Sequence, residues 1–144
     1  MDEQYNDTSL ELAIKARFAM IFGALYLCLG IILGAFAAHA LKGSLNDYQL
    51  SIMQTGVKYQ LVHGVALLII GVLILFSQQV AGLKVALLHA SSIALVFGIF
   101  CFSFSLYAIA IFDASMLGII TPIGGMAMII AWLLFMLGVY RAGK

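Results

Sequence analysis

Charged residues are scarce in this 144-residue chain, at 9% of the sequence against 65% hydrophobic residues. Soluble domains carry about 25% charged residues. There is also only one proline, whereas fourteen glycines and several long apolar runs are present. Glycine is common inside membrane spans. The shortage of charge therefore excludes an ordinary soluble domain and indicates an integral membrane protein.

Clusters of basic residues and cysteine frameworks are missing as well. The net charge is +1, and no series of lysines and arginines is available to neutralise phosphates, so nucleic-acid binding has no electrostatic basis. The two cysteines, Cys28 and Cys101, lie inside apolar stretches, where a thiol behaves as a small hydrophobic group. We expect them to be packing residues; a disulfide would require their Cα atoms to approach within ~7 Å.

Four apolar stretches are long enough to cross the roughly 30 Å hydrocarbon core of a bilayer as helices. They predict an all-α polytopic membrane protein built as a four-transmembrane-helix bundle. Residues 1–17 are polar and are expected to form an N-terminal tail, and residues 18–141 a single domain. The expected spans cover about residues 18–41, 59–76, 84–111 and 123–140.

The segments between the spans carry weaker signals. Leu45, Tyr48 and Ile52 recur at roughly helical spacing, so residues 42–58 are expected to form either an interfacial helix or an outward extension of the second span. Thr121-Pro122 is typical of a helix start, with threonine as the cap and proline in the first turn. A signal peptide is the alternative for the first span, but its apolar stretch is longer than such a region requires.

The distribution of basic residues predicts the orientation. With four spans, the tail, the connection after the second span and the C-terminus share one side of the membrane. That side holds five basic residues, against Lys42 and Lys58 on the other, and the side richer in lysine and arginine is cytoplasmic. Both termini are therefore expected in the cytoplasm. The five residues are Lys15, Arg17, Lys84, Arg141 and Lys144.

Polar side chains within this topology are expected to gather at the outer end of the bundle. Tyr59, Gln60 and His63 share one helix face because they are three and four residues apart, and from there they could hydrogen-bond to His39. The cluster either ties the helices together, since buried polar groups need partners, or forms a pocket. The candidate polar cluster comprises His39, Gln54, Tyr59, Gln60, His63, Ser105, Tyr107 and Thr121, with Lys42 and Ser103 beside them.

Carboxylates are absent from all four expected spans, which disfavours a proton-coupled transporter. A small channel or carrier subunit lined by part of the polar cluster stays an alternative. Another alternative is a haem or metal ion between His39 and His63, although no Glu-x-x-His motif or cysteine ligand accompanies them. We expect no enzyme activity and no cofactor.

Four short patterns, in this order, resemble one family. They are GAFAAHALK at 34–42, QTGVKYQLVH at 54–63, FSFSLY at 102–107 and ITPIGG at 120–125. Over about residues 17–141 the chain resembles the small bacterial membrane proteins of domain-of-unknown-function family 423, the YgdD-like proteins, to which the eukaryotic transmembrane protein 256 is related. The resemblance implies a compact four-span inner-membrane protein and adds weight to the polar cluster. It implies no activity, substrate or cofactor.

The leading hypothesis is a non-enzymatic protein of the bacterial inner membrane. Its polar cluster would be structural or would bind a small ligand, a lipid or a partner. Membrane lipids are the expected partners. A homo-oligomer or a partner membrane protein is also possible, because Gly30 and Gly34 form a G-x-x-x-G pair that allows helices to approach closely. Packing inside the bundle is the favoured use of that pair.

Overall fold

The computed structural model describes residues 2–140 and 142, and their side chains from Thr8 onward. Arg141 and Lys144, two of the basic residues assigned to the cytoplasmic side, lie outside the described residues. The expected end of the domain at residue 141 lies outside them as well.

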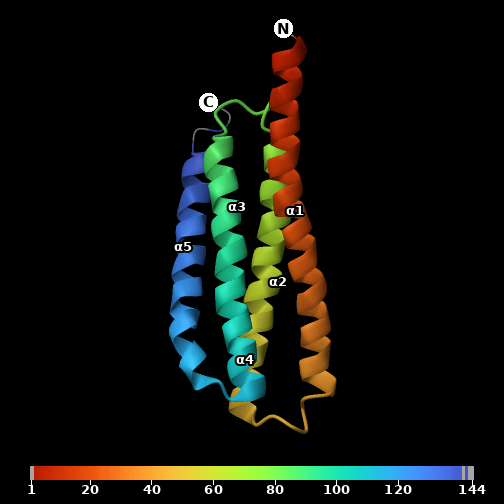
Figure 1. Cartoon of the computed structure of the whole chain (residues 1–144), viewed down its shortest axis with the longest axis vertical. Helices are drawn as coiled ribbons and strands as arrows, with labels where there is room; N and C mark the ends of the chain where they lie inside the picture. The colour runs from red at the N-terminus through yellow and green to blue at the C-terminus, as the bar shows by residue number, and fades with distance from the viewer. Residues whose placement is uncertain (1, 141, 143–144) are drawn as a thin grey trace.

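Four helices that are long and apolar enough to cross a membrane run up and down the molecule (Figure 1). The predicted all-α, four-span fold is therefore confirmed. The third span consists of two α-helices joined without a break by a π-helical segment. In chain order the elements are α1 (Asp2–His39), α2 (Asp47–Leu75), α3 (Val85–Ile99), the π segment (Phe100–Phe104), α4 (Ser105–Phe112), a 3₁₀ segment (Ser115–Ile119) and α5 (Ile120–Val139).

The helices α2 and α3 occupy the middle of the bundle, with α1 packed along α2 and α5 packed along α3. Over the described residues, no Cα atom of α5 lies within 8 Å of one in α1 or α2, although the Trp132 ring on α5 reaches the His63 ring on α2. Figure 1 shows α1 and α5 on opposite flanks, and the N-terminal end of α1 extends beyond the connection between α2 and α3. The bundle is consequently open along the side between α2 and α5.

Small residues allow the helices to pack closely. A Cβ atom at Gly124 on α5 would lie 2.4 Å from the backbone nitrogen of Phe102 and 2.8 Å from the carbonyl oxygen of Gly98. On α1, a Cβ at Gly30 would lie 2.7 Å from a methyl group of Leu61 on α2. Gly30, one member of the predicted G-x-x-x-G pair, therefore packs inside the bundle.

The helix α2 begins well before the expected span. Asn46 caps it: its side chain accepts from the Gln49 N–H at 2.9 Å, while the Gln49 side chain accepts from the Asn46 N–H at 3.0 Å. This reciprocal capping box satisfies two backbone donors at the helix start. Residues 47–58 are thus an extension of the second span. Residues 2–17 likewise belong to the same helix as the first span.

The helix α5 begins at Ile120, next to the predicted start at Thr121-Pro122, but the predicted threonine cap is wrong. The 3₁₀ segment runs directly into α5, and the N–H of Ile120 already donates to the carbonyl of Leu117. The residue before α5, Ile119, makes no side-chain cap, and the Thr121 hydroxyl lies 2.7 Å from the Ser105 hydroxyl instead. Because the preceding turn supplies backbone acceptors, the helix needs no threonine cap.

Candidate functional site

Gln60 is fully buried near the middle of α2 and connects three helices. Its amide nitrogen donates to the carbonyl of Tyr26 on α1 at 2.8 Å, and its amide oxygen accepts from the Tyr107 hydroxyl on α4 at 2.9 Å. A buried amide is stable only when its groups are hydrogen-bonded, and here both ends of the side chain have partners.

Two further hydrogen bonds surround Gln60. The Tyr26 hydroxyl donates to the carbonyl of Val96 on α3 at 2.8 Å, and the fully buried Ser103 hydroxyl donates to the carbonyl of Gly56 on α2 at 2.9 Å. Each bond joins two different helical elements. We call Tyr26, Gln60, Ser103 and Tyr107 the buried polar network.

A glycine on α2 makes room for this network. A Cβ atom at Gly56 would lie 2.6 Å from the ring of Tyr107. The ring itself is almost completely buried. The glycine therefore allows the Tyr107 ring to pass α2 closely enough for its hydroxyl to reach Gln60.

Ser105 and Thr121 form a separate polar link. The two hydroxyls are 2.7 Å apart, and the Ser105 hydroxyl is also 2.9 Å from the carbonyl of Phe102, to which it donates. This pair joins α4 to α5 and shares no hydrogen bond with the buried polar network. The pair has a structural role, because the two hydroxyls bond to each other and Ser105 also bonds to the backbone.

His63 and Tyr59 bond locally on α2. The His63 Nδ1 atom lies 2.8 Å from the carbonyl oxygen of Tyr59, one turn earlier on the same helix. Their rings stack with centroids 5.7 Å apart, and the Tyr59 ring lies 4.5 Å from Phe102. The His63 ring also lies 6.1 Å from Trp132 on α5. These two residues therefore belong to an aromatic group facing α5.

His39 does not join the polar cluster. It is the last residue of α1, and its exposed side chain forms no hydrogen bond with any described residue. The expected hydrogen bond from His39 to the face of Tyr59, Gln60 and His63 is therefore wrong. Gln54 is exposed as well and lies apart from the buried polar network.

The two histidines are too far apart to share a ligand. Gly30 lies against Leu61, so His63 is level with about Leu27 on α1. His39 is about 18 Å further along α1, at about 1.5 Å per residue. A single haem iron or metal ion cannot bridge that separation. Within residues 8–140, moreover, no group of three or more His, Cys, Asp or Glu side chains is placed to hold a metal ion.

Sequence reasoning missed part of the buried network. Tyr26 lies in an uninterrupted apolar run, where its hydroxyl gave no signal. Ser91 is also fully buried and donates to the carbonyl of Ala131 at 2.8 Å, linking α3 to α5. For Ser91, the signal that could have found it is the pair of adjacent hydroxyl residues, Ser91 and Ser92, within an apolar span. Cys28 is exposed, so its expected packing role is wrong.

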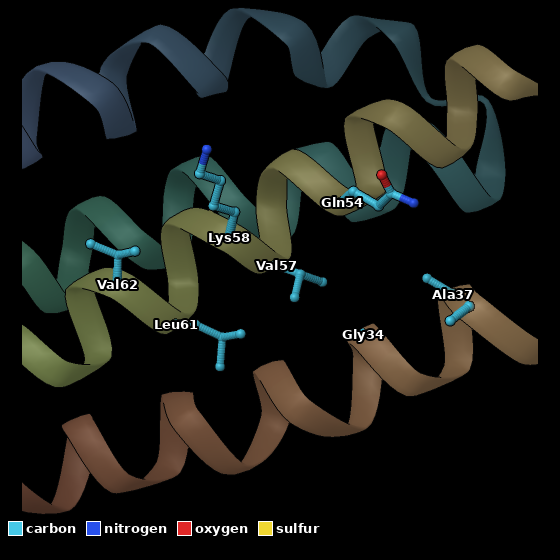
Figure 2. A pocket seen from close by; sticks show the side chains of 8 residues that line it. Gly34, Ala37, Gln54, Val57, Lys58, Leu61 and Val62 are labelled. Carbon is cyan, nitrogen blue, oxygen red and sulfur yellow. The ribbon is translucent and has the colours of Figure 1, made fainter.

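A groove on the surface of the bundle, between α1 and α2, has a volume of about 350 Å³; we call it the α1/α2 groove. In Figure 2, Val57 and Leu61 point toward α1. Lys58 and Val62 rise from the side of α2 that is turned away from α1. The polar lining consists of Lys58 and Gln54. The apolar lining consists of Gly34, Ala37, Ala38, Val57, Leu61 and Val62.

A second groove lies between α2 and α5, where the bundle is open; we call it the α2/α5 groove. Its volume is about 330 Å³. A smaller hollow of about 190 Å³ beside Lys58, Tyr59 and His63 shares Val62 with both grooves. Lys58 therefore lies where the two apolar grooves approach each other. The α2/α5 groove is lined by Val62, Val65, Ala66, Ile69, Ile70, Trp132 and Phe135.

Comparison with known proteins decides the family. The sequence family described as "Protein of unknown function (DUF423)" matches residues 33–125. The chain belongs to the DUF423 family. The predicted resemblance is thereby confirmed, and the matched region contains every lining residue of the α1/α2 groove.

Relatives within this family are named as membrane proteins. A UPF0382 membrane protein of Staphylococcus aureus is 36% identical over 125 residues, covering 87% of this chain and 97% of that protein. The UPF0382 membrane protein YwdK of Bacillus subtilis is 34% identical over 85% of this chain and 95% of its own length. The UPF0382 inner membrane protein YgdD of Escherichia coli is 31% identical over 89% and 93%. No solved structure matches the chain.

Proposed function

We propose that this DUF423 protein is a non-catalytic protein of the bacterial inner membrane that binds phospholipid in the two grooves beside α2. The observation that carries the proposal is the meeting of the α1/α2 and α2/α5 grooves at Val62, next to Lys58. Both grooves open on the surface of the bundle and are mainly apolar. Phospholipid acyl chains are the ligands that such surfaces meet in a bilayer.

The chemistry of the interior supports a non-catalytic role. Gln60 and Tyr107 bond to each other, and Ser103 bonds to the backbone of α2. Their polar groups are therefore committed to holding helices together. A catalytic group or a channel lining would instead face a cavity that a substrate or ion could enter.

The inner-membrane assignment rests on the relatives and on the charge distribution. The Escherichia coli relative YgdD is named as an inner membrane protein. The excess of lysine and arginine at the end of the bundle that holds the termini favours termini in the cytoplasm. The α1–α2 connection and Lys58 would then face the outer leaflet.

A tryptophan at the junction of the grooves tests the proposal. Val62 is exposed, so Val62→Trp should leave the helix packing intact while filling both grooves. Native mass spectrometry of the full chain in a mild detergent should show retained phospholipid on the wild type and several-fold less on Val62→Trp. The matched control is Val72→Trp, at an exposed position of the same helix. Equal lipid retention in all three proteins contradicts the proposal.

A further inference from the structure

Lys58 is a cation without an anionic partner. Its side chain is exposed and forms no ion pair or hydrogen bond within the described part of the chain. Beyond Glu11 the sequence holds only two carboxylates, Asp47 and Asp113, and neither pairs with it. An ammonium on the lipid-facing side of a span is costly unless it reaches water or an anion. The position therefore favours an anionic ligand.

The depth of Lys58 suits a lipid headgroup. Val57 packs against Gly34, five residues before α1 ends at His39, which places Lys58 about 8 Å from that end of α1. The long aliphatic stem of lysine can carry its ammonium toward the headgroup level. Gln54 lies one turn nearer the α1–α2 connection on the same helix face and offers an amide donor. Together they provide two donor groups for phosphate oxygens.

One of the two grooves runs from this position toward the centre of the membrane. The α2/α5 groove extends from Val62 to Ile70, about 12 Å further along α2 and away from the α1–α2 connection. The α1/α2 groove lies on the other side of Lys58, as Figure 2 shows, with Val57 and Leu61 on its wall. A groove that holds Lys58 and Gln54, next to an apolar groove that runs inward, matches a headgroup with an attached acyl chain.

We infer that Lys58 and Gln54 bind the phosphate of an anionic phospholipid in the α1/α2 groove, while an acyl chain of the same lipid lies in the α2/α5 groove. The inference rests on the proposed lipid binding and adds the headgroup charge and the residues that recognise it. Zwitterionic lipids also carry a phosphate, but their own ammonium offsets its charge. The site should therefore prefer lipids with a net negative charge.

Competition between two lipids tests the headgroup assignment. The full chain in a non-ionic detergent is mixed with equimolar phosphatidylglycerol and phosphatidylethanolamine, and the bound lipid is identified by native mass spectrometry. One basic residue near an anionic lipid contributes roughly 1 kcal/mol, so the wild type should prefer phosphatidylglycerol about fivefold. Lys58→Met should lose this preference, whereas Lys58→Arg should keep it.

Controls separate this inference from the proposed function. Lys42→Met removes the other basic residue at the same end of the bundle, outside the groove linings, and should keep the preference. If Lys58→Met keeps it, or if the wild type retains lipid without preference, the headgroup assignment is overturned while lipid binding stands. If the wild type retains no lipid, the proposed function itself fails. If excess inorganic phosphate abolishes the preference at constant ionic strength, the ligand is phosphate, and the lipid assignment is overturned.

Discussion

At the scale of single residues, Gln60 links α1, α2 and α4 through its side chain. The amide group makes two interhelical hydrogen bonds and is fully buried. The hydrocarbon core of a bilayer holds no water that could replace a lost partner. Interhelical hydrogen bonds in membranes average about 0.6 kcal/mol and reach about 1.7 kcal/mol. The contribution of Gln60 should therefore be measurable, although it is not dominant.

Replacing this amide with an apolar group tests that contribution. Gln60→Leu should lower the free energy of unfolding by about 1–3 kcal/mol, because it leaves the buried Tyr107 hydroxyl without an acceptor. Unfolding in mixed micelles by added dodecyl sulfate provides the measurement.

A double-mutant cycle checks that the two side chains interact directly. Tyr107→Phe removes the hydroxyl, so Gln60→Leu combined with Tyr107→Phe should cost less than the sum of the single changes. Strictly additive costs would show that the Gln60–Tyr107 bond contributes nothing.

The sequence predicted some of these residues because they are polar and lie inside spans. Gln60 and Tyr107 were found in this way, and so was the neighbourhood of Ser105 and Thr121. His39 was included because it lies near the start of the second span in the expected topology. Its exposure depends on how far α1 extends beside α2 and on how the helix is rotated, and hydropathy specifies neither.

At the scale of elements, the third span shows where periodicity ceases to be informative. The π segment Phe100–Phe104 interrupts the α-helical period between α3 and α4. Residues after such a segment face a direction that a period of 3.6 residues does not predict. Ser103 lies within the segment and bonds to α2, while Phe102 lies against Gly124 on α5. Neither contact can be predicted from a helical period of 3.6 residues.

Adjacent glycines on α5 allow a matched test of this packing. Gly124→Ala places a Cβ 2.4 Å from the backbone of Phe102, so the helices must move apart, and we expect a loss of about 1–3 kcal/mol in the free energy of unfolding. Gly125→Ala meets nothing closer than 3.8 Å and should be tolerated. Thermal unfolding of both variants in detergent is the measurement; similar melting temperatures for the two would contradict the close α3–α5 contact.

At the scale of the whole molecule, hydropathy was enough to predict the four spans, because backbone groups in a bilayer must bond within helices. It was not enough to predict which helices touch. The open side between α2 and α5 arises because α1 packs on α2 while α5 packs on α3. That arrangement creates the α2/α5 groove. The candidate lipid site therefore depends on the arrangement of the helices, which no single apolar run predicts.

The orientation of the bundle determines which leaflet would supply the lipid of the proposed site. In a background with Cys28 and Cys101 replaced by alanine, Ser44→Cys marks the α1–α2 connection and Gln79→Cys marks the α2–α3 connection; both positions are exposed. The excess of basic residues predicts that an impermeant maleimide labels Ser44→Cys on intact cells and Gln79→Cys only after the inner membrane is permeabilised. The opposite pattern would place Lys58 in the cytoplasmic leaflet. Because Lys58 lies near the α1–α2 connection, this result decides from which leaflet an anionic lipid can reach the grooves.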